Sequence, residues 1–221
     1  MEAIILNVTP PLTKIEYSSL LVLASGKKEA RIKRFRHERD AHNCLLGDML
    51  SQIMICRATG LGNDRLEFSA TEFGKPFLVN DLSIHFNISH SGDYVVCVVD
   101  NEPVGIDVEM IKPINRKIAE RFFAQDEVAY ILSARDDFDI QRFYEVWTRK
   151  ESRIKWEGKG LSTPLPSFSV FDPTEPGRPV YHKVFHNDTA ICHVCSAKSE
   201  APAVRTINTS DFLELCANMQ P

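Results

Sequence analysis

The feature that most constrains the fold is an uninterrupted apolar run from Tyr94 to Val99. A half-exposed strand alternates apolar and polar side chains, so an apolar run of this length predicts a strand that is buried on both faces. Turn sequences bound the run, with Ser91-Gly92-Asp93 before it and Asn101-Glu102-Pro103 after it. A strand of this kind requires further layers of structure on both sides.

The rest of the chain alternates helical and strand patterns. Residues 27 to 55 predict one long helix or two in succession, and further helices are expected over residues 116–132 and 139–155. Strands are expected within residues 65–100, over 104–109, and around 168–170, 180–185 and 190–195. A helix followed by Gly-Lys and then by strands occurs twice, at Gly74-Lys75 and at Gly158-Lys159. We therefore predict an α/β (α+β) fold of two similar halves related by a pseudo-twofold axis.

Composition excludes several classes of protein. The 221 residues are 43% hydrophobic and 25% charged, as in soluble globular proteins. No run of eighteen apolar residues occurs, and the first residues carry an acid where a secretory signal needs positive charge. We therefore expect a cytoplasmic protein with no membrane partner and with reduced cysteines, including the Cys192/Cys195 pair, which lies in an apolar, strand-like run. The net charge of −4 argues against a general nucleic-acid binder.

A basic segment nevertheless interrupts this acidic chain. Seven basic residues stand against two acids over residues 27–39, and they are Lys27, Lys28, Arg31, Lys33, Arg34, Arg36 and Arg39. Such a local excess of positive charge indicates an anion site, although charge alone is equally consistent with a solvated helix face.

Two carboxylates occupy alternate positions of the predicted strand over residues 104–109. Side chains alternate faces along a strand, so Ile106 and Val108 are expected in the core, with Asp107 and Glu109 together on the opposite face. Acids about 7 Å apart on a rigid strand repel each other unless a cation lies between them, and oxygen ligands suit Mg²⁺. A solvent-facing strand with ordinary acids remains the alternative.

Two further segments carry groups that suit a phosphate. On the predicted helix, Trp147, Glu151 and Lys155 share one side, where Glu151 could be a third carboxylate ligand and Lys155 could face an anion. The alternative is a surface Glu–Lys pair, although the tryptophan argues against full exposure. The second segment, Ser89-His90-Ser91, offers hydroxyl and imidazole donors before a glycine turn, or is simply a polar turn. Walker, GxGxxG and GxSxG motifs are absent from the sequence.

The chain contains an ordered series of motifs. They are Ser89-His90-Ser91, Gly105-Ile106-Asp107-Val108-Glu109 and Trp147-Thr148-x-Lys150-Glu151-Ser152-x-x-Lys155, together with Gly74-Lys75-Pro76 and Arg121-Phe122-Phe123. In this series the chain resembles the 4′-phosphopantetheinyl transferases. Their order and the chain length resemble the monomeric Sfp-type branch, which activates peptide and polyketide synthetases in antibiotic biosynthesis, rather than the half-length trimeric branch. The similarity covers most of residues 25–170.

The resemblance implies the location and composition of an active site. It implies two halves, residues 1–103 and 104–221, with coenzyme A bound in the cleft between them. The implied Mg²⁺ ligands are Asp107, Glu109 and Glu151. The residues implied near the adenine are Phe73, Gly74, Lys75 and Pro76. The residues implied at the 3′-phosphate are Lys28, Arg31 and His90, and those at the pyrophosphate are Ser89 and Lys155.

The resemblance also implies the reaction. A carrier-protein serine attacks the β-phosphate of coenzyme A and expels adenosine 3′,5′-bisphosphate. Lys155 is the expected partner of the leaving phosphate. The base is either Glu151 or a metal-bound water oriented by Glu109, and the sequence leaves this choice open. One departure from the family concerns phosphate binding, because Asn43 stands where an arginine is usual and Arg31 where a lysine is common.

The expected partner is an acidic, helical carrier protein or domain of the peptidyl, acyl or aryl type. Basic and apolar residues mix over residues 112–123, which suits such a helix, although ordinary helix packing explains the pattern equally well. Two rival functions remain. An RNA-binding module built on residues 27–39 lacks interleaved aromatic residues, and another Mg²⁺-dependent transferase fits the carboxylates but not the whole series of motifs.

Overall fold

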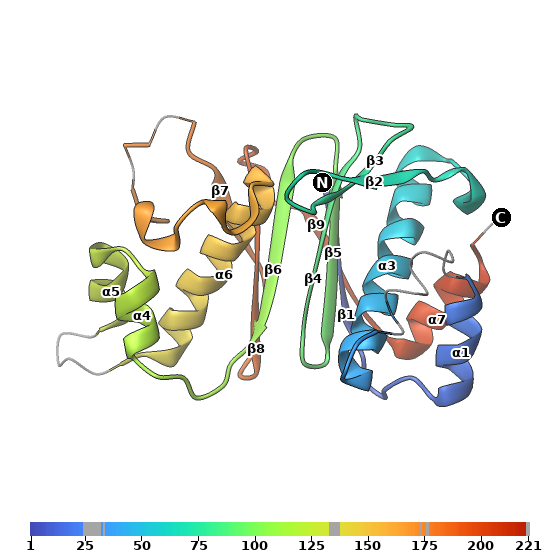
Figure 1. Cartoon of the computed structure of the whole chain (residues 1–221), viewed down its shortest axis with the longest axis horizontal. Helices are drawn as coiled ribbons and strands as arrows, with labels where there is room; N and C mark the ends of the chain where they lie inside the picture. The colour runs from blue at the N-terminus through green and yellow to red at the C-terminus, as the bar shows by residue number, and fades with distance from the viewer. Residues whose placement is uncertain (24–31, 33, 133–137, 173, 176, 220–221) are drawn as a thin grey trace.

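Three strands of the first half and one strand from near the end of the chain form a sheet that helices cover (Figure 1). The computed structural model describes residues 1–23, 32, 34–132, 138–172, 174–175 and 177–219. The first sheet has the order β4-β5-β1-β9, and only the β1–β9 pair is parallel. Its strands are β1 (Glu2–Asn7), β4 (His85–Ser91), β5 (Tyr94–Asp100) and β9 (Ala203–Asn208). The helices on its outer face are α1 (Lys14–Leu23), α3 (Glu38–Thr59) and α7 (Thr209–Ala217).

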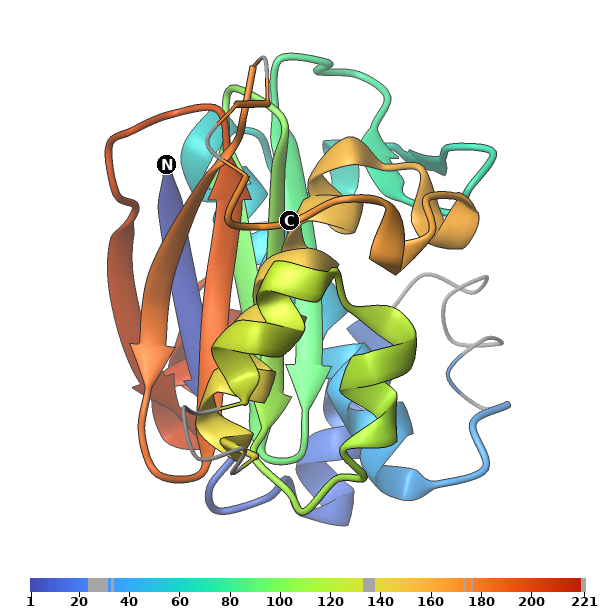
Figure 2. The same cartoon turned by 90° about the vertical axis from the view of Figure 1, so that its left-hand side faces the viewer.

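The second half has its own antiparallel sheet in the order β6-β8-β7. Its strands are β6 (Val104–Met110), β7 (Val180–His186) and β8 (Ala190–Ser196). The helices are α4 (Lys117–Phe122), α5 (Gln125–Ile131) and α6 (Ile140–Glu157), which lie in front of this sheet in Figure 2. A separate hairpin consists of β2 (Phe68–Ala70) and β3 (Pro76–Leu78), and short 3-10 turns are η1 (Asn63–Arg65), η2 (Gly160–Ser162) and η3 (Leu165–Ser167).

The predicted double burial of β5 is confirmed, because every residue of this strand is buried. Val95, Cys97 and Val99 pack in the core between the first sheet and its helices. Val96 and Val98 face the other way and pack against the apolar face of the second sheet. The two sheets therefore lie face to face, with helices outside each of them, in the four layers visible in Figure 1.

The two halves repeat the same arrangement, as predicted. The strand order β4-β5-β1 of the first sheet corresponds to β7-β8-β6 of the second. In each half a long helix ends at a glycine in the left-handed conformation, Gly60 with φ 72° and Gly158 with φ 70°. The structural counterpart of Gly158 is therefore Gly60 and not Gly74, which lies in a loop with φ 83°.

The end of the chain returns to the first half. β9 pairs with β1, and side chains of α7 enter the core beneath the first sheet. The division of the chain at residue 103 therefore remains a prediction about folding units. Among the helices of the described residues, none is long and apolar enough to cross a bilayer.

Two expected helical regions are resolved further by the structure. One long helix or two in succession were predicted over residues 27–55. Residues 34–37 are not helical and α3 begins at Glu38, so a single long helix is excluded. An earlier helix would fall on residues 24–31 and 33, which lie outside the described part of the chain. The helix expected over residues 116–132 is divided into α4 and α5, because the Ala124 N–H donates to the Glu127 carboxylate and begins a new helix.

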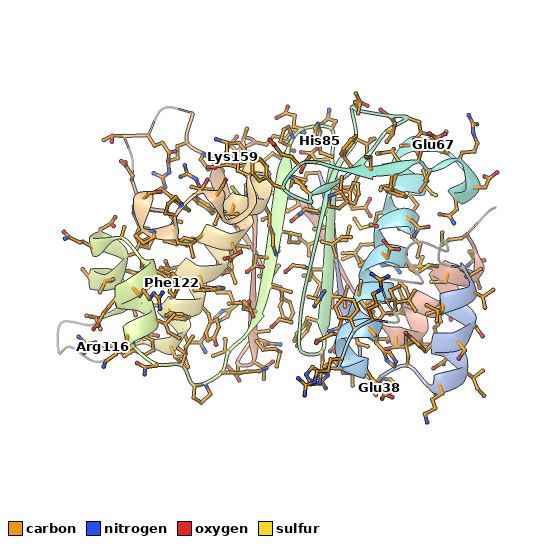
Figure 3. All side chains as sticks on the ribbon, in the orientation of Figure 1. Glu38, Glu67, His85, Arg116, Phe122 and Lys159 are labelled. Atoms are coloured by element: carbon orange, nitrogen blue, oxygen red, sulfur yellow. The ribbon has the colours of Figure 1, made fainter. Side chains whose placement is uncertain are left out.

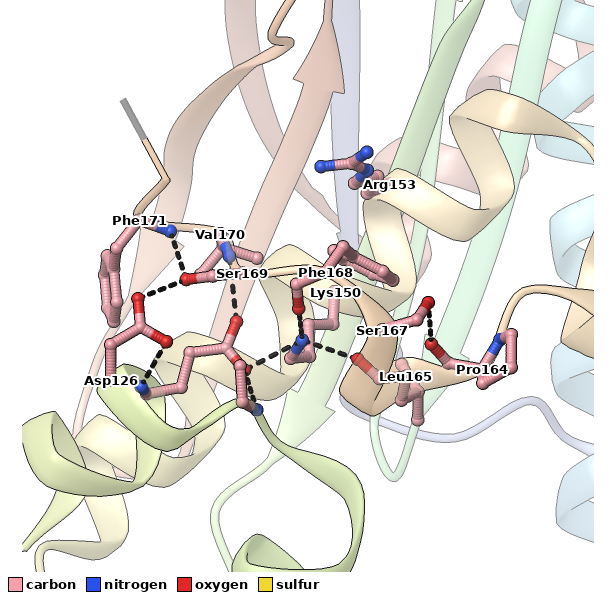
Figure 4. A network of polar contacts seen from close by, with 12 residues as sticks. Asp126, Lys150, Arg153, Pro164, Leu165, Ser167, Phe168, Ser169, Val170 and Phe171 are labelled. Carbon is pink, nitrogen blue, oxygen red and sulfur yellow. Dashed lines mark hydrogen bonds and ion pairs between the residues drawn. The ribbon is translucent and has the colours of Figure 1, made fainter. Parts of the chain in front are cut away.

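The strand expected around residues 168–170 does not form, because a buried ion pair takes its backbone groups (Figure 4). Lys150 Nζ lies 2.8 Å from Glu127 Oε2, and both side chains are fully buried. The same ammonium donates to the carbonyl oxygens of Leu165 and Phe168, and Glu127 Oε1 accepts from the Val170 N–H. With these groups satisfied by side chains, the segment has no need of a neighbouring strand.

Candidate active site

The site lies where β4 of the first sheet runs beside β6 of the second. Side chains of β4, and not a backbone ladder, join the two strands. Three backbone N–H groups of β6 donate to polar side chains at every second position of β4, as the alternation of a strand requires. These bonds run from Ile106 N to Asn87 Oδ1 at 2.9 Å, from Val108 N to Ser89 Oγ at 3.4 Å and from Met110 N to Ser91 Oγ at 3.1 Å. We call this set of contacts the β4–β6 seam.

The two carboxylates of β6 lie on this seam. Ile106 and Val108 are fully buried between the sheets, so the predicted alternation of the strand is confirmed. Ser89 Oγ donates to Asp107 Oδ1 at 2.9 Å, and Ser91 Oγ donates to Glu109 Oε2 at 2.7 Å. Each serine therefore accepts from a backbone N–H of β6 and orients one acid of the same strand.

Helix α6 brings a cation to the same point. Lys155 Nζ donates to Asp107 Oδ1 at 2.6 Å and to Ser89 Oγ at 2.9 Å. Lys155 thus pairs with an acid of β6 and does not form the surface pair with Glu151 that the helical spacing also allowed. Asp107, Ser89 and Lys155 come from β6, β4 and α6, so three elements that are distant in sequence meet at one carboxylate.

The close approach of α6 to β6 depends on Gly105. A Cβ at this position would lie 2.0 Å from the carbonyl oxygen of Ser152 and 2.4 Å from the backbone nitrogen of Trp156. No larger residue fits, because these obstacles are backbone atoms of the helix. The ends of α6 are also fixed: the Asp139 carboxylate caps its first turn and Gly158 ends it.

The three acids share an electrostatic environment that disfavours their negative charge. Burial raises the pKa of Asp107, although Lys155 and Ser89 oppose the shift. Burial and the charge of Asp107 raise the pKa of Glu109 to about 7. Burial and Asp107 also raise the pKa of Glu151. Asp107 is only 4% exposed, which excludes the alternative of a solvent-facing acid at this position.

The carboxylate oxygens of these three acids suit a hard cation. The candidate ligand atoms of Asp107, Glu109 and Glu151 are all carboxylate oxygens, and Asp107 Oδ2 is buried with no hydrogen-bond partner among the described residues. Within the described residues, no three Asp, Glu, His or Cys side chains are gathered as a ready-made metal site. Asp107, Glu109 and Glu151 therefore need side-chain adjustment to share one ion, and their assignment as metal ligands remains a prediction.

A cavity of about 280 Å³ opens beside the seam, between α3, β4 and the loop that precedes β3. Of the residues predicted to contact coenzyme A, it is lined by Gly74, Pro76 and His90. Phe73 is about half exposed and is not part of the lining. Lys28 and Arg31 lie outside the described residues.

Asn43 has a structural partner in this wall. Its side chain is 3% exposed, lines the cavity and donates from Nδ2 to the carbonyl oxygen of Gly92 at 3.0 Å. Gly92 has φ 57° in the turn between β4 and β5. The residue that replaces the usual arginine of the family therefore fixes the turn that carries Ser91.

Sequence reasoning missed two features of the site. Asn87 and Ser91 were not expected to bind the backbone of another sheet. The available signal was that polar residues occupy the alternate positions 87, 89 and 91, so that their side chains share one face of the strand. The partners of the Lys75 side chain were also missed. Lys75 was predicted near the adenine, and that remains a prediction, but its ammonium donates to backbone carbonyls of the second half.

Comparison with known proteins identifies the family. Residues 103–210 match a family model described as the 4′-phosphopantetheinyl transferase superfamily, and residues 11–102 match one described as the N-terminal part of a 4′-phosphopantetheinyl transferase. The 4′-phosphopantetheinyl transferase Sfp of Bacillus subtilis (strain 168) is 45% identical over 160 residues, 72% of this chain and 71% of that protein. The 4′-phosphopantetheinyl transferase gsp of Aneurinibacillus migulanus is 38% identical over 170 residues, 77% and 71% of the two chains.

The chain belongs to the 4′-phosphopantetheinyl transferase superfamily. Within this family it is of the Sfp type, as its similarity to the Bacillus and Aneurinibacillus proteins indicates.

Proposed function

We propose that the protein transfers the 4′-phosphopantetheine arm of coenzyme A to a serine of a carrier protein and releases adenosine 3′,5′-bisphosphate. The observation that carries the proposal is the meeting of Asp107, Ser89 and Lys155 beside a cavity. A cation, a hydroxyl and a buried acid at one point suit a diphosphate held with a metal ion. Family membership supports the same chemistry.

The cavity is the proposed adenine site. Its walls combine apolar groups with backbone atoms of the loop at Gly74 and Pro76, as a flat heterocycle requires. His90 lines the same cavity and is the proposed contact for the 3′-phosphate, together with Lys28 and Arg31. From there the pyrophosphate would run toward Ser89 and Lys155 on the seam.

Asp107, Glu109 and Glu151 are the proposed holders of Mg²⁺. Two observations support this assignment. Asp107 Oδ2 has no hydrogen-bond partner within the residues that the structure describes. The pKa of all three acids is raised, and a bound cation would lower it again. When bound, the ion would neutralise charge on the phosphoryl oxygens. Lys155 would also neutralise charge on the phosphoryl oxygens, because its ammonium lies against Asp107.

The proposed chemistry is a substitution at phosphorus. The carrier serine oxygen forms a bond to the β-phosphorus as the bond to the bridging oxygen breaks, and that oxygen leaves with adenosine 3′,5′-bisphosphate. The serine proton passes to Glu151 or to a water oriented by Glu109. Ser91 holds the Glu109 carboxylate in place, and Lys155 is the partner of the leaving phosphate.

The proposed carrier is acidic and helical, because the surface that follows β6 is basic. Lys117 and Arg121 of α4 are exposed, and the Arg121 guanidinium lies 5.1 Å from the ring centre of Phe122. Phe123, which was expected on this surface, is 4% exposed and packs against Phe143 and Trp147 in the core. The surface therefore offers cations and one partly buried ring.

Intact-protein mass spectrometry tests the proposal. The protein is incubated with coenzyme A, Mg²⁺ and an apo-carrier, and the carrier is expected to gain the mass of one phosphopantetheine arm. A carrier whose acceptor serine is replaced by alanine serves as the control and should gain nothing. An unmodified carrier under these conditions would refute the proposed function, and metal-independent binding of RNA would support the rival.

A further inference from the structure

Lys75 joins the two halves of the molecule. It lies in the loop between β2 and β3, in the first half. Its ammonium reaches across to three backbone carbonyl oxygens of the second half, at 3.1 Å from Val104, 2.5 Å from Lys155 and 3.4 Å from Trp156. Val104 begins β6 and the other two residues lie in the last turn of α6.

These contacts satisfy groups that the fold leaves open. The last carbonyl oxygens of an α-helix have no partner within the helix, and the negative end of its dipole attracts a cation. Lys75 supplies both a donor and a charge at the C-terminal end of α6. Its aliphatic chain passes Gly158, where a Cβ would lie 3.3 Å from Lys75 Cδ.

This arrangement is costly for a lysine. Its hydrogen-bond acceptors are uncharged carbonyls, and burial lowers its pKa to about 8. A methionine of similar length would avoid the burial of a charge but would leave these carbonyl oxygens without their donor. The lysine therefore provides donors at this joint at a cost to its charged form.

The loop that carries Lys75 is itself held rigidly. The Lys75 N–H donates to Thr71 Oγ1 at 3.1 Å, and its carbonyl oxygen accepts from the Thr71 N–H at 2.9 Å. Its neighbours Gly74 and Pro76 line the cavity beside the seam. One residue therefore connects the cavity wall to the end of the helix that carries Lys155 and to the start of the strand that carries Asp107.

We propose that Lys75 is a positioning residue that sets the distance between the nucleotide cavity and Lys155, so that a diphosphate bound through its nucleotide comes within reach of Lys155 and Asp107. This inference rests on the proposed function. It assigns the Lys75 side chain to the joint between the halves and not to contact with the nucleotide. Loss of the ammonium would leave the cavity intact but would release the last turn of α6.

The two roles of Lys75 predict different effects on a fragment of coenzyme A. Adenosine 3′-monophosphate contains the adenine and the 3′-phosphate but no pyrophosphate, so it probes the cavity alone. For Lys75→Met we expect kcat with coenzyme A and carrier to fall about tenfold or more, because a misplaced reacting group slows transfer. The Kd of adenosine 3′-monophosphate should remain within about twofold of the wild type.

Two further variants complete the test. Lys75→Arg keeps the charge and the donors and is expected to recover kcat to within about threefold of the wild type. Lys159→Met makes the matched change at an exposed lysine just beyond the end of α6 (Figure 3) and should leave kcat unchanged. If Lys75→Met fails to fold by circular dichroism, Lys75→Gln takes its place.

The results separate failure of this inference from failure of the proposed function. A wild-type protein that transfers nothing would refute the function itself. With an active wild type, an unchanged kcat in Lys75→Met would overturn the positioning role. A loss of affinity for adenosine 3′-monophosphate of about tenfold would also overturn it, because Lys75 would then be a nucleotide contact.

Discussion

At the scale of single residues, Asp107 is the group that contacts the side chains of both β4 and α6 in the site. Its Oδ1 accepts hydrogen bonds from Ser89 and Lys155, while its Oδ2 is buried and has no hydrogen-bond partner in the described part of the chain. Burial raises its pKa, and its charge raises the pKa of Glu109 and of Glu151. We propose that this acid contributes to function through a metal ion, because burial disfavours its charge even with the Lys155 ammonium beside it.

Replacement of this acid by its amide isolates the charge. Because Asp107 is 4% exposed, alanine would leave a hole, whereas Asp107→Asn preserves the shape of the side chain. We expect kcat to fall about 100-fold or more, as for the loss of a charged group that stabilises a transition state. Steady-state kinetics at saturating Mg²⁺ measure this, with circular dichroism to verify the fold. Near-wild-type turnover would refute the role of Asp107.

The depressed pKa of Lys75 predicts how stability depends on pH. The folded protein loses this proton near pH 8, against a usual value of 10.5, so between these values the unfolded chain binds more protons. The contribution of Lys75 to stability therefore rises with pH over this range. Its charged or titratable neighbours are His85 of β4 and Cys195 of β8.

The comparison with Lys75→Met isolates this contribution from those neighbours. Urea unfolding of both proteins at about pH 7 and about pH 9.5 measures the free energy of unfolding of the wild type minus that of Lys75→Met. This difference should be about 2 kcal/mol more favourable to the wild type at the higher pH. A constant difference would show that the ammonium is not buried as the structure has it.

At the scale of elements, the site depends on how α6 rests against β6. Gly105 lets the helix backbone approach the strand, and Lys75 caps the end of that helix. The β4–β6 seam then orients the two acids of β6. Each of these contacts joins elements from different parts of the chain, so the geometry of the site depends on packing and not on local structure.

Gly105→Ala tests this packing. The added methyl group would overlap the backbone of α6, so the helix must shift, and we expect a loss of about 3 kcal/mol in unfolding free energy together with most of the transferase activity. Gly60→Ala is the matched control at a left-handed position, where an added Cβ would have no atom of the described residues within 4 Å. A loss of about 1 kcal/mol is expected there, with activity retained. Equal effects of the two changes in denaturation and activity assays would contradict the packing argument.

The basic surface of α4 makes a separate prediction about the carrier. Lys117→Glu with Arg121→Glu should raise KM for an acidic carrier about tenfold or more, because the reversed charges repel it. KM for coenzyme A should stay constant, because neither residue lines the proposed nucleotide cavity. Arg65→Glu with Arg205→Glu changes the net charge equally at exposed positions on η1 and β9 and should have little effect. Equal KM values for the two double variants would exclude α4 as the docking surface.

The elements that could be predicted from the sequence are those whose pattern is local. The apolar run of β5 and the alternation of β6 each revealed which faces are buried. The segment at residues 168–170 misled the prediction because its backbone groups bind a buried ion pair contributed by α5 and α6. The sequence of residues 168–170 alone gives no indication that this ion pair exists.

At the scale of the whole molecule, two similar halves meet along one seam, and the proposed chemistry lies on it. The residues of the site were predicted from their motifs, but their partners across the seam were not, because Asn87, Ser89 and Ser91 bind a strand of another sheet. The pairing of β9 with β1 in the first sheet was also not predicted, because the residue pattern of a strand does not indicate which strand it pairs with.

The most direct test of the account is the effect of Mg²⁺ on coenzyme A binding, measured by isothermal titration calorimetry. The wild type should bind coenzyme A about tenfold or more tightly with Mg²⁺ than with a chelator, since the proposed ion would be held by both the pyrophosphate and the three acids. In Asp107→Asn the ratio should fall below about twofold. Equal affinity of the wild type with Mg²⁺ and with the chelator would contradict the account.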